Sequence, residues 1–325
     1  MPLGDPVGIH PARCRGMLWR RGLYVLLIQP LVACEGASGG APPCQSPSSA
    51  TTPVAVEATP RGDVLRWPNE PKGFTTLTDW PYDQLVSKAS GKFMRGVNVW
   101  NQTGGTGSAA VVCDANAPLS PPGVAQLTYP AGQLSGTAPW TLYFVSSPPG
   151  REFYTAFWWQ ASNPWQGDPS GINKITFWQD GAPSSGNLVL MMNNQHQASY
   201  LLTVTLEFNE AINGHLANAA GDGTVWHLFG NVSGGNYQIV PGNWYRIELY
   251  FKGSSTPTAR DGIVRWWATK RGDTAPTQVG NYVDVNFDTP DFVQFSFAPT
   301  WGGNSGVRKL GLDYYRIDHV YVSRP

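Results

Sequence analysis

The sequence predicts an all-β protein in which short antiparallel strands form a sandwich or barrel, and three observations support this fold class. Turn formers are abundant, with 37 glycines and 28 prolines among 325 residues. Charged residues make up only 14% of the chain and aromatic residues 12%, a balance that favours strands over amphipathic helices. From about position 65 onward, short β-branched and aromatic runs recur, each closed by Gly, Pro, Asn or Asp. With 41% hydrophobic residues, the chain can bury one sizeable core or two small ones.

These runs define the predicted strands in chain order. Each combines β-branched or aromatic residues with a turn former at its end, as strands of sandwiches and barrels do. One stretch, 81–89, is predicted to be a short helix. The predicted strands cover residues 93–100, 124–129, 140–146, 153–161, 174–179, 187–193, 200–208, 224–229, 244–252, 262–269, 282–286, 292–298 and 314–322.

The run 244–252 alternates between two kinds of side chain, and successive strand residues point to opposite sides of a sheet. The apolar side, predicted to face the core, consists of Tyr245, Ile247, Leu249 and Phe251. The other side, expected to face water or line a groove, consists of Trp244, Arg246, Glu248, Tyr250 and Lys252. In the next run, 262–269, either side could bury its tryptophan, so the orientation of that strand stays open.

The N-terminal region has the layout of an export signal. After Met17 come two arginines, an apolar run at 23–31, and the tetrad Leu-Val-Ala-Cys that ends at Cys34. The run is much shorter than the roughly 20 apolar residues of a spanning helix, so we expect no permanent anchor. The tetrad resembles the lipobox of bacterial lipoproteins, which implies cleavage before Cys34 and a diacylglycerol on its thiol; the alternative is a chance cysteine after an ordinary signal peptide. Residues 1–16 fit no such signal, which favours a translation start at Met17.

The predicted organisation has three parts: the signal at 1–34, a tether at 35–64 and a β domain at 65–325. The tether is rich in Gly, Ser, Pro and Thr and has no apolar period, so we expect an extended chain. Glu35 follows the cysteine, and the resemblance to sorted lipoproteins then implies the outer membrane in a cell that has one. Cys44 in the tether and Cys113 in a predicted loop could pair in an oxidising compartment, or remain two free thiols.

Four segments of the domain resemble the concanavalin A-like jelly rolls. They read NWYRIELY at 243–250, DGIVRWW at 261–267, PTWGG at 299–303 and DYYRIDHVYVS at 313–323. The resemblance covers roughly residues 90–325 and is strongest to the lectin/glucanase and polysaccharide-lyase branches. It implies a two-sheet antiparallel jelly-roll sandwich. Because this fold hosts lectins, hydrolases and lyases, it fixes no activity.

The acidic residues argue against one activity of this fold. Hydrolases that resemble laminarinases carry Glu-x-Asp-x-x-Glu on one strand, and the nearest string, 207–210, has the wrong spacing. A lyase needs a base and a group that neutralises a uronate carboxylate. His196 could serve, and so could Tyr250 and Lys252, whose string at 250–253 partly resembles an element of jelly-roll alginate lyases. The Gln-x-His pair and the Tyr-x-Gln continuation of those enzymes are absent, so a strand-end pair and a loop histidine are the alternatives.

A sugar-binding module needs only rings that stack on sugars and polar groups that bond to hydroxyls. Rings could come from Trp158, Trp159, Trp165, Trp178, Trp267 and Trp301, several of which must lie in the core, and polar groups could also come from Gln294. The candidate binding or catalytic residues are Trp178, Asn193, Gln195, His196, Arg246, Glu248, Tyr250, Lys252, Arg265, Trp267 and Trp301. We expect a sugar to lie across the strand that carries Arg246 and Glu248, unless these two pair with each other or with Arg265.

Charge and motif content limit the partners. Removing the signal, with its four arginines and one acid, leaves a slightly acidic mature chain, which excludes a nucleic-acid binder. No cofactor is required and no Cys/His metal spacing occurs, although Asp168, Asp180, Asp222 and Asp313 could hold a structural Ca²⁺. The leading prediction is an envelope lipoprotein, bound to the membrane only by its N-terminal lipid, whose domain binds and could cleave polysaccharide. A lyase is favoured over a glycoside hydrolase; the alternative is a structural or protein-interaction domain of the envelope.

The lipobox prediction can be tested with Cys34→Ala. Loss of the thiol removes the attachment point of the acyl chains, so the variant should move from the membrane fraction to the soluble fraction. The measurement is fractionation of cells followed by detection of the protein. Retention of the variant in the membrane to the same extent as the unmodified chain would contradict lipidation at this residue.

Overall fold

The computed structural model describes residues 67–82, 92–95, 98–120, 123–180, 187–194, 198–207, 212–213, 216, 228–229, 237–288, 291–303 and 305–325. The predicted signal, Cys34 and the tether lie outside these residues, as does most of the predicted helix at 81–89. Pro81 and Tyr82, which are described, are not helical. Within the described part of the chain, no helix is long and apolar enough to cross a membrane.

The first sheet has 8 antiparallel strands in the order β15-β14-β13-β7-β17-β5-β4, and β1 pairs with β17. The strands are β1 (Thr75–Trp80), β4 (Ser108–Cys113), β5 (Gly123–Tyr129), β7 (Glu152–Ala161), β13 (Tyr245–Lys252), β14 (Gly262–Lys270), β15 (Thr277–Val285) and β17 (Asp313–Arg324). β17 connects the sheet because its first half pairs with β5, its second half with β1, and most of its length with β7.

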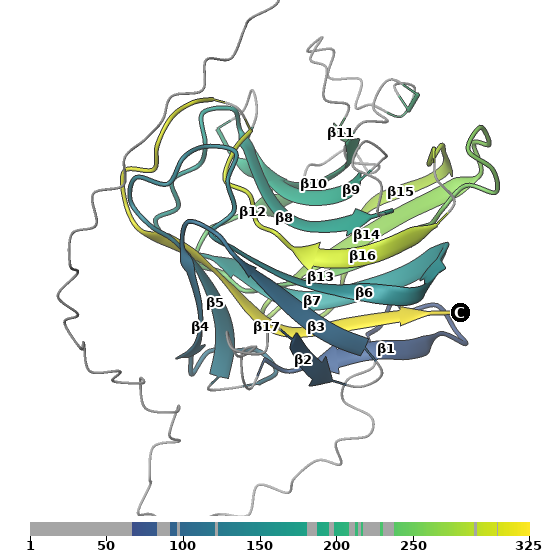
Figure 1. Cartoon of the computed structure of the whole chain (residues 1–325), viewed down its shortest axis with the longest axis horizontal. Helices are drawn as coiled ribbons and strands as arrows, with labels where there is room; N and C mark the ends of the chain where they lie inside the picture. Colours follow the sequence, from purple (N-terminus) through teal and green to yellow (C-terminus); the bar gives the residue numbers. More distant parts are fainter. Residues whose placement is uncertain are drawn as a thin grey trace, which may run out of the picture. The chain divides into compact units, whose positions relative to one another are not determined.

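The second sheet has 9 antiparallel strands in the order β11-β10-β9-β8-β16-β6-β3-β2, and β12 pairs with β10. The strands are β2 (Lys92–Arg95), β3 (Asn98–Gly104), β6 (Trp140–Gly150), β8 (Ile172–Gln179), β9 (Asn187–Asn193), β10 (Tyr200–Glu207), β11 (Leu228–Phe229), β12 (Gln238–Ile239) and β16 (Phe292–Phe297). The two sheets form the jelly-roll sandwich that the sequence predicts (Figure 1).

The predicted strands are found with three kinds of difference. The run at 93–100 is divided between β2 and β3, and the run at 224–229 contributes only the short β11 among the described residues. β1, β4 and β12 were not predicted. β4 reads Ser-Ala-Ala-Val-Val-Cys, whose intrinsic strand preference is weak, and it forms because six consecutive residues pair with β5.

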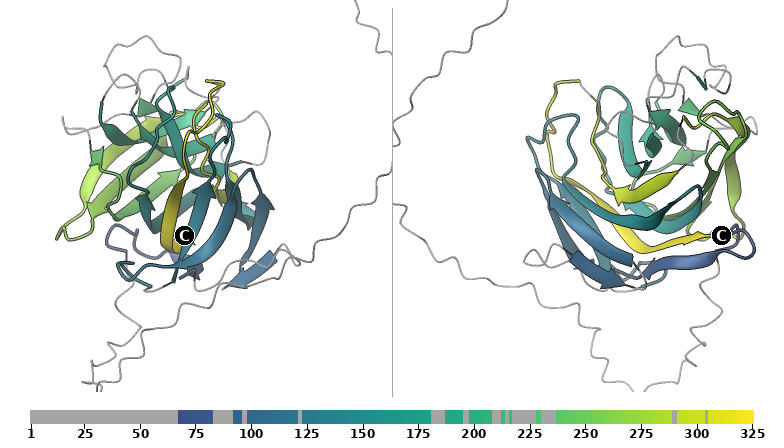
Figure 2. Two further views of the ribbon diagram at one scale, coloured as in Figure 1. Left: turned by 90° about the vertical axis from the view of Figure 1, so that its left-hand side faces the viewer. Right: turned by 45° about the vertical axis from the view of Figure 1, so that its right-hand side comes forward.

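The core lies between the two sheets and is unusually aromatic. Trp178 of β8 stacks on Phe153 of β7 with ring centroids 4.3 Å apart, so one contact joins the two layers. The apolar side of β13 faces this core as predicted, and Tyr245, Ile247, Leu249 and Phe251 are all buried. Two further views show the long strands as curved ribbons wrapped around this interior (Figure 2).

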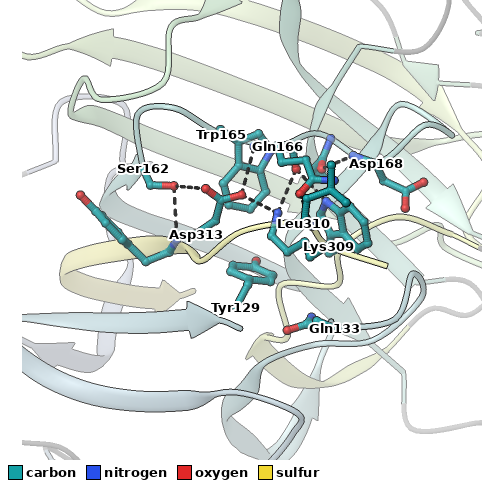
Figure 3. A network of polar contacts seen from close by, with 12 residues as sticks. Tyr129, Gln133, Ser162, Trp165, Gln166, Asp168, Lys309, Leu310 and Asp313 are labelled. Atoms are coloured by element: carbon teal, nitrogen blue, oxygen red, sulfur yellow. Dashed lines mark hydrogen bonds and ion pairs between the residues drawn. The ribbon is translucent and has the colours of Figure 1, made fainter. Parts of the chain in front are cut away.

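One end of the sandwich is closed by a buried lysine. Lys309 lies in the loop before β17, its side chain is 0% exposed, and its Nζ is 2.5 Å from the carboxylate of Asp313 (Figure 3). The same ammonium donates to the carbonyl of Gln166 at 2.9 Å. Asp313 also accepts hydrogen bonds from the Ser162 hydroxyl at 2.9 Å and the Gln166 amide at 3.0 Å. Both charges are therefore hydrogen-bonded as well as paired.

Aromatic rings surround the lysine on its other sides. Its Nζ lies 4.4 Å from the Trp165 ring centroid, 4.6 Å from that of Trp301 and 5.5 Å from that of Tyr129. A desolvated ammonium over an aromatic face gains about 2 kcal/mol. Burial lowers the pKa of Lys309 and the Asp313 carboxylate opposes that shift. The rings and the carboxylate together keep a cation inside the protein.

A glycine lets the neighbouring loop approach this cluster. Gly302 has a φ of +77°, and a Cβ at this position would lie 2.3 Å from the carboxylate of Asp168. A side chain would therefore be strained and would displace Asp168.

The lysine cluster predicts a large stability effect. Lys309→Met removes the cation and leaves the Asp313 carboxylate buried, which should lower the free energy of unfolding by about 3 kcal/mol. Urea denaturation measures this value. Arg308→Met, at the exposed neighbouring cation whose side chain donates to the Gly132 carbonyl, is the control and should change it by less than about 0.5 kcal/mol. Equal stability of both variants would refute the structural role of Lys309.

Candidate functional site

Six predicted site residues lie together on the outward face of the first sheet. They are Arg246, Glu248, Tyr250 and Lys252 of β13 and Arg265 and Trp267 of β14. The register places Glu248 opposite Trp267 and Tyr250 opposite Arg265. Trp266, on the other side of β14, is buried in the core, which settles the orientation that the sequence left open.

The expectation that this face meets water is wrong for its centre. Glu248 is 0% exposed because the segment 67–74 lies over β13. The backbone and side-chain amides of Asn69 each donate to the carboxylate at 3.0 Å. The Tyr154 hydroxyl donates at 2.5 Å and Arg246 Nε at 2.9 Å. Burial, and then the Glu248 charge, raise the pKa of Tyr154 well above its usual range, so this hydroxyl remains a donor.

The remaining residues of the face are also engaged within the protein. The Tyr250 hydroxyl donates to Glu152 at 2.7 Å, and Lys252 lies 3.3 Å from the same carboxylate. Arg265 lies 5.8 Å from the centroid of the Tyr250 ring and donates to Asn281 at 2.8 Å. A second apolar cluster forms here, from Trp67, Ala117, Val124, Tyr154, Ala156, Trp158, Trp244, Tyr250 and Tyr321, with Trp267 packed against it. Arg246 and Glu248 therefore pair with each other, which was the alternative to a sugar lying across this strand.

Four of the tryptophans considered as sugar platforms, Trp159, Trp165, Trp178 and Trp301, are core residues, and Trp158 is buried in the second apolar cluster. Trp178 is 0% exposed and its Nε1 donates to the Thr155 hydroxyl at 3.0 Å. Trp301 is 0% exposed and its Nε1 donates to the Gln166 carbonyl at 2.8 Å. The prediction that these rings contact a ligand is therefore wrong, because the sandwich uses them for packing.

The other predicted residues are only partly covered by the structure. Gln195, His196, Cys34 and Cys44 lie outside the described residues. Cys113 is the last residue of β4 rather than a loop residue, and it is disulfide-bonded. Its pairing with Cys44 stays a prediction.

Two of the aspartates considered as calcium ligands, Asp168 and Asp313, bond to different groups within the protein. Asp313 belongs to the lysine cluster, and Asp168 accepts from the Ser170 amide at 2.8 Å and the Ser305 hydroxyl at 3.0 Å. Asp222 lies outside the described residues. No group of three or more His, Cys, Asp or Glu side chains in the described part of the chain is placed to hold a metal ion.

A different polar face runs across the second sheet, on the side away from the core. Its side chains alternate with the core residues of five strands and provide amides, hydroxyls and one ion pair. The same side also carries a small apolar cluster of Ile172, Phe177, Val189 and Met191, and its polar residues on β9 and β10 and Ser296 of β16 are buried. They include Asn101 of β3, Tyr143 of β6, Gln294 and Ser296 of β16, Lys174 and Gln179 of β8, Met191 and Asn193 of β9, and Thr203, Thr205 and Glu207 of β10. We call this set the outer face of the second sheet.

The ion pair of this face joins Lys174 to Glu207. The two side chains form a close contact across β9 and are 15% and 7% exposed, so water screens them little. The Lys174 Nζ also lies 5.4 Å from the centroid of the Phe177 ring. The ion pair therefore lies on the outward side of the sheet, away from the apolar core, and is largely covered within the protein.

Amides and hydroxyls lie on both sides of this pair. Gln294 donates to Gln179 at 2.6 Å, which fixes the orientation of both amides. Among the described residues, the buried Thr203 hydroxyl has no hydrogen-bond partner. Tyr143, Gln179 and Gln294 are partly exposed. Groups of this kind can bond to the hydroxyls of a sugar chain laid across the strands.

Sequence reasoning found Asn193 and Gln294 of this face but missed Lys174. The signal was present, since Lys174 is the one charged residue of the strand INKITFWQ. Simple alternation, however, places Lys174 on the same side as Trp178, which is in the core. A bulge between Lys174 and Thr176 reverses the phase and turns the lysine outward.

The backbone resembles those of polysaccharide lyases. Alginate lyase Aly36B matches at a TM-score of 0.46 and 18% identity, over 67% of this chain and 86% of that one. An endo-β-1,4-glucuronan lyase from the fungus Trichoderma reesei gives 0.45 and 14%, over 67% and 88%, and an alginate lyase from Aplysia kurodai gives 0.44 and 12%, over 66% and 87%.

Neither a protein-family model nor a curated protein matches the chain. The similarities to solved structures say nothing of what this chain binds or cleaves.

The buried carboxylate of the first sheet yields a prediction. Glu248→Ala leaves the Asn69 amides, the Tyr154 hydroxyl and Arg246 without their acceptor, so the free energy of unfolding should fall by about 3 kcal/mol while glycan binding is unchanged. Urea denaturation and a glycan-binding titration measure the two effects. Asp273→Ala, at an exposed acid in the turn after β14, is the control and should be close to neutral. Weaker glycan binding with full stability would restore Glu248 as a ligand contact.

Proposed function

We propose that this protein binds an acidic polysaccharide on the outer face of the second sheet, held at the cell envelope by a lipid on Cys34. The observation that carries the proposal is the Lys174–Glu207 pair set among amides and hydroxyls on the outward side of β8, β9 and β10. A face built only to meet water has no need of a nearly buried cation. A polymer of uronic acids offers the matching carboxylate and hydroxyl groups.

The arrangement across the strands supports an extended ligand. Tyr143, Ser296 and Phe177 lie on three adjacent strands in direct register, as do Val145, Gln294 and Gln179. Adjacent strands are roughly 4.8 Å apart, so three of them span about the length of a disaccharide. Rigid strand residues lose little conformational entropy on binding, which favours affinity.

Lys174 is the residue that would select an acidic sugar. Its ammonium can donate three hydrogen bonds, and Glu207 accepts one of them, so donors remain for a sugar carboxylate. A charge-assisted hydrogen bond of this kind contributes about 1.5–3 kcal/mol. A neutral sugar gains no such term and would be bound less tightly.

Cleavage by β-elimination is the second candidate function. The reaction removes the proton beside the carboxylate, breaks the bond to the leaving glycosidic oxygen and forms a carbon–carbon double bond, while that oxygen takes up a proton. Lys174 would neutralise the carboxylate and so make the proton easier to remove. Tyr143, a partly exposed phenol on the same face, is the candidate for proton transfer.

The test uses Lys174→Ala and its matched control Lys270→Ala, an exposed lysine at the end of β14 on the other sheet. Calorimetric titration with oligomers of mannuronate, guluronate, glucuronate and galacturonate should identify an acidic ligand. Lys174→Ala should weaken its binding at least about 10-fold, and Lys270→Ala should leave it unchanged.

Two further measurements complete this test. Because Glu207 loses its partner in Lys174→Ala, the double variant with Glu207→Gln separates lost stability from lost binding. An assay of the unsaturated product by ultraviolet absorbance decides whether the bound polymer is cleaved. Binding of no glycan by the unmodified protein, together with capture of an envelope protein on this face, would favour the interaction-domain alternative.

A further inference from the structure

We propose a second binding site, for an anionic sugar, in a cavity on the outward face of the first sheet. The cavity has a volume of about 380 Å³ and is lined by residues of β7 and β17, the β4–β5 loop and the turns before β13 and after β14. It lies on the opposite sheet from Lys174. This proposal can therefore be correct or wrong independently of the function proposed for the outer face of the second sheet. Its size suits one or two sugar residues.

The first observation is a fixed arginine beside a ring. Arg316 of β17 donates from Nη1 to Asp114 at 3.0 Å and from Nε to Gln126 at 3.0 Å. Its guanidinium carbon lies 4.6 Å from the centroid of the Tyr314 ring. A guanidinium has five donors, so these bonds hold it in place and leave others for a ligand.

The second observation is a cation that has no acid partner. Arg271, in the turn after β14, is exposed, and its hydrogen bond runs to the carbonyl of Asn116 at 2.6 Å. None of the described carboxylates forms an ion pair with Arg271. The lining therefore holds two arginines against one acid, Asp114, and carries net positive charge.

The third observation concerns the other groups of the lining. Trp244 is 3% exposed and supplies an apolar wall. Gln160 donates to the Gly242 carbonyl at 2.8 Å and keeps its amide oxygen as an acceptor. That oxygen can accept a hydrogen bond from a sugar hydroxyl.

These features together favour a uronic acid over a phosphate compound. Arg271 and Arg316 supply the cations for one carboxylate, and Tyr314 supplies a ring for stacking. The carboxylate of Asp114 and the amides of the lining suit neighbouring hydroxyls.

The experiment is a titration of the full chain with tetrasaccharides of mannuronate, guluronate, glucuronate and galacturonate, with cellotetraose as the neutral probe. We expect one of the uronate probes to bind and cellotetraose not to bind. Arg271→Ala should weaken the binding at this site about 10-fold, and Arg271→Ala with Tyr314→Ala should abolish it. Arg308→Ala, an exposed arginine of another loop, is the control and should change nothing.

The two sites are separated by combining variants. Binding that survives Lys174→Ala but not Arg271→Ala belongs to the cavity, and the reverse pattern belongs to the outer face of the second sheet. Arg271 is exposed, so its replacement should keep the melting temperature and the result stays a statement about binding. Binding of no uronate probe after Lys174→Ala, unchanged affinity in the Arg271 and Tyr314 variants, or preference for inorganic phosphate or a nucleotide would each overturn the proposal.

Discussion

The buried ion pair of Lys309 and Asp313 is the constraint on which the arrangement of the two sheets depends at one end. Asp313 is the first residue of β17, so the pair fixes where this strand of the first sheet begins. Trp301, whose ring lies against the lysine, forms a bridge with Asn173 of β8 in the second sheet. The next residue, Lys174, donates its backbone amide to the Thr300 carbonyl at 3.0 Å. One desolvated cation thus helps to position β17, which carries Arg316, and β8, which carries Lys174. The rings and hydrogen bonds around the cation offset the cost of burying it.

A chain segment covers part of the outward face of the first sheet. On the first sheet, the segment 67–74 covers β13 and converts Glu248 from a surface acid into a buried acceptor with four donors. The same cover ends before the turn at 242–244, and there the polar cavity with Arg271 begins. One face of a sheet can therefore contain both buried residues and a binding site. Whether its side chains are buried depends on the segment that covers them and not only on the strand that carries them.

The sequence predicted the sandwich and most of its strands because alternation and turn chemistry are local properties. The core side of β13 is an example, since each of its apolar residues is buried as expected. The exposure of Glu248 could not be predicted, because its donor Asn69 is 179 positions away in the chain. Lys174 was missed for a different reason: one bulge in β8 shifts the phase of alternation, and no residue of INKITFWQ marks that bulge. Local sequence rules thus identify strands. The exposure of a site residue depends in addition on segments distant in the sequence that cover it and on single bulges that change which way it points.

The two proposed sites differ in how their cations could share charge, and this difference bears on what each could do. Arg316 offers a planar fork with separate donors, so it can keep Asp114 on one edge while a sugar carboxylate takes another. Lys174 is a single point charge against Glu207, so an arriving carboxylate must share the same ammonium or displace its partner. A site of the first kind holds its ligand without rearrangement and suits retention of a polymer. A site of the second kind exchanges one carboxylate for another, which suits a face that must release what it has bound. If both proposals hold, the sheet with the arginines retains the polymer and the sheet with Lys174 is where it would turn over.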